Sequence, residues 1–383
     1  MKILQINALY KPAYIYGGPT MSVSALSEQL AKNGYNIEVF TTTANGKTEL
    51  PVIKNTIQQV NGVGVWYFQR ISKDHSHFAP LLLLALLKRA RSFDLIHIHT
   101  WWNLVSVLSC LIAICRDIPI VLSPRGTLSH YTFNHNGKFI KKLFHALAGR
   151  FLLNHCHIHC TSKREQLVVA RLIKPLNVFN IYNLVQFGNQ SQTPFRKEAQ
   201  LKLLYLSRIA PKKGIELLLN ALSESHIPWQ LSIAGDGNQA YINQLKALSR
   251  QYEIEDHIQW LGFKEQDKFE LMAQHEVLIL PSYDENFGNV IIESLSVGTA
   301  VLVSNKVGLA SYIQKNNLGW VCNTNSRSVK DNLNNIYQHP EILHSIRKFA
   351  PEIIANDFNK DLLIRQYFNM YQQIKQKNGK KHD

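Results

Sequence analysis

Two glutamates, Glu285 and Glu293, lie eight positions apart in the segment 282–299, which reads SYDENFGNVIIESLSVGT. A carboxylate has four acceptor sites, so a side chain of this kind can accept hydrogen bonds from both hydroxyls of a vicinal diol. The alternative for an acid near the start of a helix is a solvated side chain that interacts favourably with the helix dipole. The surrounding elements distinguish a binding site from a surface acid.

The flanking sequence places these acids near the carboxyl end of a strand. The apolar run Val277–Leu280 predicts a buried strand that Pro281 ends, and apolar residues resume at helical spacing from Val290. Gly298 then provides a helix stop. The first glutamate therefore falls in a loop and the second about one turn into a helix. At the start of that helix, the free N–H groups of Asn289 and Val290 suit anionic or hydroxyl oxygens.

A second charged group occurs earlier in the chain. Arg208 and Lys213 lie five positions apart in the turn SRIAPKKG, between an expected strand at 201–206 and an expected helix at 215–223. Two cations at the carboxyl end of a strand can converge on one diphosphate. The alternative is an exposed basic turn.

Strands and helices alternate along the first half of the chain, which predicts a parallel sheet covered by helices. The expected strands are at 2–7, 35–41, 63–69, 95–99 and 120–123, and the expected helices at 19–33, 80–91 and 103–115. In the first strand-to-helix turn, Gly17 and Gly18 carry no side chains that would keep a ligand's phosphates away. The segment 62–64 lacks the third glycine of a dinucleotide fingerprint and precedes a strand, so we expect no nicotinamide site there.

Two polar side chains at strand ends in this half are candidates for chemistry. His99 ends the run DLIHIH and shares a strand face with His97, so it either faces a ligand or is a satisfied core histidine. Arg125, in the loop SPRGT after the next strand, can bind an acceptor phosphate or stabilise a leaving group. Its alternative is an ordinary surface arginine.

The segment around the two glutamates resembles the E-x7-E motif of family 4 glycosyltransferases. The shared pattern is Pro281-Ser282, Glu285-x-Phe287-Gly288, Glu293-Ser294 and Gly298-Thr299. The spacing of Arg208 and Lys213 and the turn 235–237 are similar to the same family, so the resemblance covers nearly the full chain.

This resemblance implies an α/β fold of the GT-B type, with two Rossmann-like domains facing a central cleft. An acceptor-binding domain is expected at 1–185, a nucleotide-sugar-binding domain at 201–356, and a C-terminal helix at 357–383 that packs back toward the first domain. The polar stretch 186–200 has the composition of a linker between them. The implied activity is transfer of a sugar, with retention of anomeric configuration, from a nucleotide-diphosphate sugar to a saccharide acceptor.

The resemblance also implies roles for individual residues. Arg208 and Lys213 would neutralise the diphosphate as it leaves, Glu293 would bind the ribose hydroxyls and Glu285 the hydroxyls of the donor sugar. His99 and Arg125 join Glu285 as the expected catalytic residues. The remaining expected donor-binding residues are Gly17, Gly18, Gly262, Phe263, Phe287, Gly288, Asn289 and Val290.

Two segments depart from the family pattern. Many relatives carry a His-Gly pair where this chain has Arg125-Gly126, and a Pro-Asn-Gly-Val-Asp segment where it reads YNLVQ at 182–186. The resemblance therefore does not define the acceptor side. Its Pro-Arg-Gly-Thr form is similar to bacterial transferases that build surface polysaccharide on lipid carriers.

The positive charge of the chain indicates an acidic binding partner. With 42 Lys and Arg against 27 Asp and Glu, the chain carries a formal charge of +15, which favours a nucleotide sugar, an anionic membrane surface or nucleic acid. We expect no nucleic acid, because the sequence has neither a binding motif nor interleaved basic and aromatic residues. The sequence contains no Asp-x-Asp, so we expect no metal and no cofactor, and cationic side chains would balance the diphosphate.

Apolar runs and cysteines indicate a cytoplasmic protein. The longest apolar runs, 79–87 and 104–115, are too short to cross a bilayer, and residues 1–10 read as a first strand rather than a signal peptide. The five cysteines form no disulfide framework. In the run HCHIHC at 155–160, a strand would put cysteines on one face and histidines on the other, which favours packing over a zinc site.

The segment 137–154, GKFIKKLFHALAGRFLLN, predicts a basic amphipathic helix. Its apolar stripe is either a core face or, with the lysines beside it, a surface for anionic lipid or a lipid-linked acceptor. The protein would then be peripheral on the inner face of the cytoplasmic membrane. Three rival functions stay open: a nucleic-acid-binding protein, a GT-B enzyme of another type such as an epimerase or phosphorylase, and a non-catalytic nucleotide-sugar-binding subunit.

Overall fold

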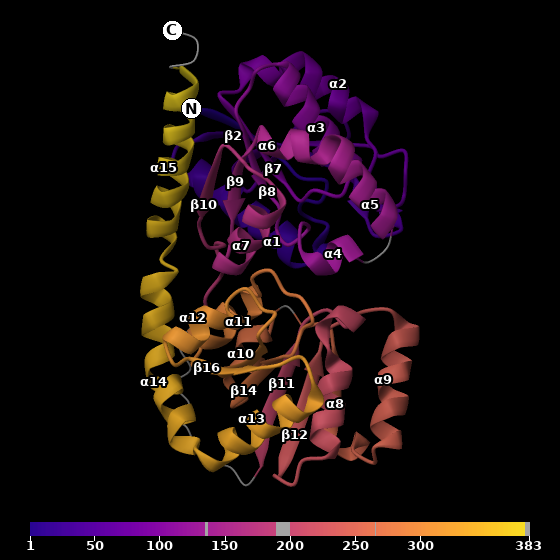
Figure 1. Ribbon diagram of the computed structural model, residues 1–383, viewed down its shortest axis with the longest axis vertical. Helices are drawn as coiled ribbons and strands as arrows, with labels where there is room; N and C mark the ends of the chain where they lie inside the picture. The colour runs from indigo at the N-terminus through magenta and orange to yellow at the C-terminus, as the bar shows by residue number, and fades with distance from the viewer. Residues whose placement is uncertain (135–136, 189–199, 265, 380–383) are drawn as a thin grey trace. The chain divides into compact units, whose positions relative to one another are not determined.

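The computed structural model describes residues 1–134, 137–188, 200–264 and 266–379. The chain divides into two compact units (Figure 1), one comprising Met1–Leu184 and Lys360–Asp383 and the other Val185–Asn359. Each unit has a sheet with helices packed on it, parallel throughout in the second unit and parallel but for one strand in the first. Of the expected linker, residues 189–199 lie outside the described residues.

The first unit contains a sheet of eight strands. In spatial order they are β10 (Asn177–Asn180), β9 (His157–Cys160), β8 (Ile120–Ser123), β7 (Leu95–His99), β1 (Lys2–Ile6), β2 (Asn36–Thr42), β6 (Val63–Phe68) and β5 (Ile57–Val60). Neighbouring strands are parallel except β5 and β6, which form an antiparallel hairpin. β5 was not among the expected strands, because its residues IQQV carry two polar side chains at the edge of the sheet. The short strands β3 (Ala44–Asn45) and β4 (Thr48–Glu49) form a separate hairpin.

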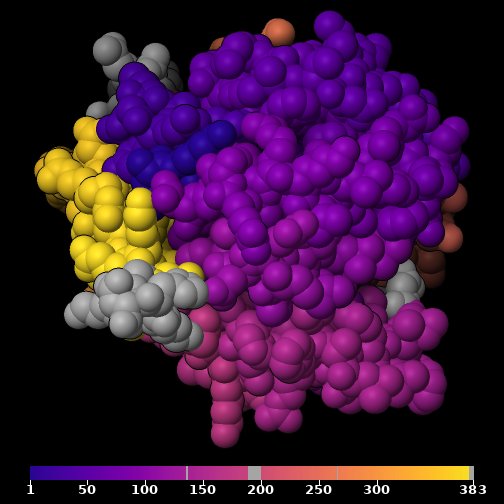
Figure 2. All heavy atoms as spheres, turned by 90° about the horizontal axis from the view of Figure 1, so that it is seen from above, coloured from indigo at the N-terminus to yellow at the C-terminus, as the bar shows by residue number. Residues whose placement is uncertain are grey.

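Helices cover both faces of this sheet. They are α1 (Gly18–Lys32), α2 (Pro80–Arg89), α3 (Leu104–Cys115), α4 (His130–Asn134), α5 (Lys138–Phe144), α6 (Arg150–Asn154), α7 (Lys163–Leu172) and α15 (Lys360–Gly379). Because successive strand residues point to opposite faces, Leu4 enters one apolar layer and Ile3 the other. The second layer includes Tyr367 and Tyr371 of α15, and Figure 2 shows this C-terminal helix, in yellow, beside the indigo start of the chain.

The expected helix at 137–154 is present, but its apolar stripe is not a core face. It consists of α5, a π turn at His145–Gly149 and α6. Phe139 is 76% exposed and Leu147 is 75% exposed. The core-face interpretation is therefore wrong, because most of this stripe lies on the surface of the unit.

The histidine and cysteine run at 155–160 packs as a strand should. Cys156 and Cys160 lie in the apolar layer, where Cys156 Sγ is 3.5 Å from Cys110 Sγ, while His159 faces Tyr367 of the other layer. Within the described part of the chain, no three His, Cys, Asp or Glu side chains gather as metal ligands would. In the same part of the chain, every helix is too short or too polar to cross a membrane.

The second unit contains six parallel strands. Their spatial order is β13 (Ile258–Gly262), β12 (Trp229–Ala234), β11 (Leu201–Leu206), β14 (Val277–Leu280), β15 (Ala300–Ser304) and β16 (Gly319–Cys322). Its helices are α8 (Ile215–Ser223), α9 (Gln239–Gln251), α10 (Lys268–Ala273), α11 (Asn289–Ser296), α12 (Ala310–Lys315), α13 (Ser326–Gln338) and α14 (Pro340–Asp357). The structure confirms the strands expected at 201–206 and 277–280 and the helix expected at 215–223.

Candidate active site

The strand order of the second unit creates a switch point between β11 and β14. From β11 the chain moves outward to β12 and β13, and then returns to the other side of β11 with β14, β15 and β16. In open α/β sheets, ligands bind outside the carboxyl ends of the strands at such a point. The loop that carries Arg208 and Lys213 follows β11, and the loop of Glu285 and the helix of Glu293 follow β14, so the fold brings both candidate groups to one edge.

The two loops are joined by backbone and side-chain contacts. The Tyr283 N–H donates to the Lys212 carbonyl at 2.9 Å, and Lys212 Nζ lies 2.9 Å from a carboxylate oxygen of Asp284. Gly214 has a φ of 70°, and a Cβ there would lie 2.4 Å from the Pro281 carbonyl oxygen. Only glycine therefore permits this approach of the two loops.

The central contact of the site is an ion pair between Lys213 Nζ and Glu285 Oε2. The backbone of Glu285 is held separately: its N–H donates to the Lys306 carbonyl at 3.1 Å, and its carbonyl accepts from the Gly308 N–H at 2.8 Å. Burial raises the pKa of Glu285, but the charge of Lys213 outweighs it and the pKa is lowered overall. The carboxylate is thus ionised, and an arriving diphosphate would compete with it for the lysine.

Glu293 forms a second ion pair. It lies in the second turn of α11, and its Oε1 is 3.1 Å from Lys268 Nζ on α10, a lysine that is only 8% exposed. Lys268 was not among the expected site residues, because it lies 25 positions before Glu293 and belongs to no motif. The structure places its ammonium group beside the carboxylate expected to bind a ribose.

The helix start beside these acids has the expected form. Asn289 and Val290 are the first residues of α11, which follows Gly288 at a φ of 85°. Phe287 is buried and its ring packs against Phe358 at a centroid distance of 6.2 Å, so only its backbone is available to a ligand.

Three more expected donor-binding residues, Arg208, Gly262 and Phe263, lie at or just after the ends of strands of the second unit, at the same edge of its sheet. Arg208 is exposed after β11, and its carbonyl accepts a hydrogen bond from Tyr205 at 3.2 Å. Gly262 ends β13 with a φ of 68°, and its carbonyl accepts from Gly235 at 2.8 Å. Phe263, the next residue, is 63% exposed, and its expected place near the nucleobase stays a prediction.

The first unit has a switch point of its own, between β1 and β7. Gly17 and Gly18 lie at the start of α1 after β1, and a Cβ on either would meet nothing within 4 Å. No side chain of the described residues crowds the backbone at the two glycines, and their contact with a ligand stays a prediction.

His99 ends β7 and is fully enclosed. Its Nε2 lies 2.6 Å from Gln5 Oε1, and its Nδ1 accepts from Arg125 Nε at 3.2 Å. Burial, then His97 and Arg125, hold the pKa of His99 well below its usual value. With both ring nitrogens engaged, this geometry favours the satisfied core histidine over a group that touches substrate.

Arg125 is better placed for contact with a ligand. Its backbone has a φ of 50°, in the left-handed region that non-glycine residues rarely adopt, and its Nη1 donates to Asn183 Oδ1 at 3.0 Å. Its Nη2 is buried and has no hydrogen-bond partner among the described residues. The adjacent Gly126 N–H donates to Glu165 at 2.7 Å, which holds the loop in place.

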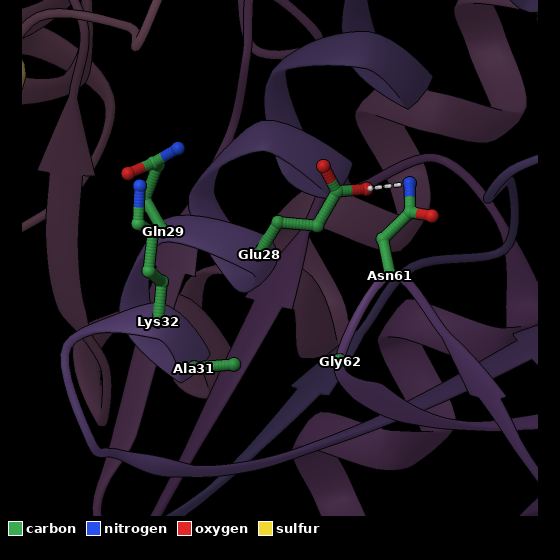
Figure 3. Close-up of a pocket in the computed structure, with 6 residues that line it drawn as sticks. All are labelled: Glu28, Gln29, Ala31, Lys32, Asn61 and Gly62. Carbon is green, nitrogen blue, oxygen red and sulfur yellow. Dashed lines mark hydrogen bonds between the residues drawn. The ribbon is translucent and has the colours of Figure 1, made fainter.

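One surface pocket lies in the first unit, away from the switch point of that unit. It has a volume of about 420 Å³ and is lined by Glu28, Gln29, Ala31, Lys32, Asn61 and Gly62 (Figure 3). These residues belong to the end of α1 and the turn before β6, at the amino edge of the sheet. Its acid, Glu28, is already bonded to Asn61 and Lys11, at 3.2 and 2.6 Å. Because the pocket lies at the amino edge, it does not belong to the candidate residues at the carboxyl edge.

Two family models match the chain. The one described as Glycosyltransferase Family 4 matches residues 16–186, and the one described as Glycosyl transferases group 1 matches residues 187–353. The chain belongs to the family 4 glycosyltransferases. This glycosyltransferase is 26% identical to an uncharacterized glycosyltransferase of Methanocaldococcus jannaschii, over 97% of this chain and 98% of the relative.

Solved structures are similar to this glycosyltransferase over nearly its whole length. The Anabaena protein HepE in complex with UDP-glucose has a TM-score of 0.75 at 19% identity and covers 97% of this chain and 100% of its own. WaaG, a glycosyltransferase involved in lipopolysaccharide biosynthesis, has a TM-score of 0.70 at 14% identity and covers 97% and 99%. These likenesses confirm the expected GT-B fold of two Rossmann-like domains, and the central cleft stays a prediction.

Proposed function

We propose that this glycosyltransferase moves a sugar, with retention of anomeric configuration, from a nucleotide-diphosphate sugar to a hydroxyl of a saccharide acceptor. The observation that carries the proposal is the Lys213–Glu285 ion pair at the β11–β14 switch point, with Glu293 on the helix that follows. Cations for a diphosphate and carboxylates for hydroxyls meet there at one sheet edge. The UDP-glucose bound to the similar Anabaena protein supports this class of donor.

The proposed chemistry uses charge rather than a protein nucleophile. The bond between the anomeric carbon and the diphosphate oxygen breaks while the acceptor oxygen bonds to that carbon, and the acceptor's proton passes to the departing diphosphate on the same face. Arg208 and Lys213 balance the charge that develops on the diphosphate, without a metal ion. Glu285 binds the hydroxyls of the donor sugar and Glu293 those of the ribose.

We further propose that the acceptor is lipid-linked and that the enzyme works at an anionic membrane surface in surface polysaccharide synthesis. The support is the helix of α5, the π turn and α6, whose stripe of Phe139, Ile140, Leu143, Leu147 and Phe151 is exposed. The segment 137–154 contains Lys138, Lys142 and Arg150 but no acid, which complements anionic lipid headgroups. The role of the WaaG relative in lipopolysaccharide biosynthesis supports the same class of product.

The π turn helps this stripe to stay on one side of the helix. Residues spaced four apart drift by about 40° per step in an α-helix, because 3.6 residues complete each turn. A π turn winds more loosely and takes back part of that drift. Phe151 therefore stays closer to the side of Phe139 and Leu143 than an uninterrupted α-helix would allow.

The donor site is tested by thermal unfolding with UDP-, GDP- and ADP-sugars in the presence of EDTA. We expect one nucleotide family to raise the Tm of the wild type and of Lys212→Ala, but not of Lys213→Ala. Lys212 is the matched control, because it is the adjacent lysine and pairs with Asp284 rather than Glu285. A shift that survives in Lys213→Ala, or the absence of any shift, would contradict the proposed site, and the anomeric configuration of the product, read by NMR, tests retention.

A further inference from the structure

A line of buried polar side chains crosses the sheet of the first unit and ends at Arg125. It begins at His159 on β9 and continues through Ser123 on β8, His97 on β7, Tyr371 on α15, Gln5 on β1 and His99 on β7. All six side chains are at most 1% exposed. We call this line the relay.

At one end of the relay, a backbone carbonyl determines which ring nitrogen of His159 carries the proton. His159 Nε2 lies 2.9 Å from the Ile181 carbonyl oxygen, which can only accept, so the ring proton of a neutral His159 is on Nε2. Its Nδ1 must then accept from the Ser123 hydroxyl at 2.6 Å. Burial, with the charge of Arg125, lowers the pKa of His159 to about 3, in agreement with a neutral ring.

The middle of the relay follows from this start. Ser123 has donated its proton, so its oxygen accepts from His97 Nε2 at 2.7 Å. His97 Nδ1 must then accept from the Tyr371 hydroxyl at 2.8 Å. The Tyr371 oxygen in turn accepts from Gln5 Nε2 at 3.4 Å, which turns the amide so that its Oε1 faces His99.

At the other end of the relay, Arg125 independently requires the same direction of the hydrogen bonds. A guanidinium has only donors, so Arg125 Nε requires His99 Nδ1 to accept. His99 must then carry its proton on Nε2 and donate to Gln5 Oε1 at 2.6 Å. Read from Arg125 or from Ile181, every bond has the same direction, and all three histidines are neutral with the proton on Nε2.

This order leaves Arg125 with one uncommitted nitrogen. Nε is held by His99 and Nη1 by Asn183, while Nη2 is buried without an acceptor among the described residues. A buried charged donor without a partner costs free energy, which an incoming anionic oxygen would recover. The arginine as a whole is partly exposed, so its loop is within reach of a ligand.

We propose that Arg125 binds an anionic oxygen of the substrate through Nη2, and that Tyr371 and Gln5 are positioning residues that hold it there through His99. The proposal rests on the proposed function, because the site belongs to the substrates of the transfer. It adds that one substrate carries an anionic group, a phosphate or a carboxylate, at the carboxyl edge of the first unit. The family's His-Gly pair would not supply a permanent charge at this place, whereas Arg125 does.

The first test is the 15N NMR spectrum of the histidine rings in the wild-type protein at neutral pH. We expect His97, His99 and His159 to be neutral and protonated on Nε2. A proton on Nδ1 of His99, or a charged His99, would overturn the relay. This measurement uses the wild-type protein, so it tests the direction of the relay even if a substitution prevents folding.

The second test compares two tyrosines one helical turn apart on α15. Tyr371 donates within the relay, whereas Tyr367 lies only beside it, with its hydroxyl 3.2 Å from His159 Nε2, and both are at most 1% exposed. We expect Tyr371→Phe to change the Nδ1 resonance of His97 and to weaken the binding of inorganic phosphate about fivefold, as loss of one hydrogen bond would. Tyr367→Phe should leave the His97 resonance and phosphate binding unchanged. Equal effects of the two variants would show that Tyr371 has only a structural role.

Phosphate binding is measured in a background that carries both Arg208→Ala and Lys213→Ala, so that neither cation of the donor site contributes. Arg125→Gln should abolish it, and unchanged binding in this variant would overturn the proposal. Parallel titrations with phosphate and acetate distinguish the two kinds of anion. A failure of the Arg125 proposal can be told apart from a failure of the donor site. The nucleotide-induced rise in Tm at the donor site depends on Lys213 and not on Arg125.

Discussion

Lys213 and Glu285 lie 72 positions apart in the chain and form an ion pair between the loops that follow β11 and β14. The side chains are 13% and 19% exposed, so water screens the pair only partly. This contact connects the residue expected to balance the diphosphate with the residue expected to bind the sugar. A ligand that bound both side chains would therefore have to replace this ion pair.

Removing one partner of this ion pair should lower the free energy of unfolding more than replacing both partners with neutral side chains. We expect Lys213→Met to lower the free energy of unfolding by about 1–2 kcal/mol, because it leaves the Glu285 carboxylate without its cation. The double variant with Glu285→Gln should recover part of that loss. Urea unfolding of the two single variants and the double variant measures the coupling, and additive effects would show that the pair contributes nothing.

The junction of the two loops depends on Gly214. Gly214→Ala should lower the free energy of unfolding by about 2 kcal/mol or more, because the new Cβ would meet the Pro281 carbonyl oxygen and the backbone φ is positive. Gly262→Ala is the control: its φ is 68°, but a Cβ there meets nothing within 4 Å, so we expect about 1 kcal/mol. Equal losses in urea unfolding would mean that the close approach of the loops adds nothing.

The exposed stripe should bind anionic bilayers. In vesicle co-sedimentation we expect the wild type to bind phosphatidylglycerol vesicles and not phosphatidylcholine vesicles, with binding that weakens as salt is raised. The double variant Phe139→Ser and Leu147→Ser should bind at least tenfold more weakly, because two apolar side chains no longer enter the bilayer. Ile53→Ser with Ile71→Ser is the matched control, since these isoleucines of the same unit are similarly exposed but lie outside the helix. If both pairs behave alike, the helix is not the docking element.

Stability should fall as the pH is lowered below about 6.5, the ordinary pKa of histidine. The pKa values of His97, His99 and His159 are lowered, chiefly by burial, and that of His159 is about 3. Between the unfolded and folded pKa values the unfolded chain binds more protons, so acid favours unfolding by about 1.4 kcal/mol per pH unit for each histidine. Above pH 6.5 this contribution to stability is fully present. Urea unfolding at pH 7.5, 6.5 and 5.5 measures the slope, and a flat profile would mean that these rings are charged in the folded state.

Local sequence was enough to predict much of the sheet and its polar ends. The apolar runs at 201–206 and 277–280 are bounded by turn residues, and the structure forms strands over those residues. The spacing from Arg208 to Lys213 and from Glu285 to Glu293 identified the candidate site, because the ends of strands in such a sheet meet at one edge. The roles of these residues stay predictions.

The pairings within the site were decided only by the tertiary structure. Lys268 beside Glu293, and Tyr371 beside Gln5 at a separation of 366 positions, belong to no motif and follow from which helices pack on which strands. The amphipathic pattern at 137–154 likewise could not tell a buried face from an exposed one, because periodicity records that a helix has two faces and not what covers them. By itself the sequence determined the elements and the kinds of group at their ends. Partners and exposure came from long-range packing, which no local pattern contains.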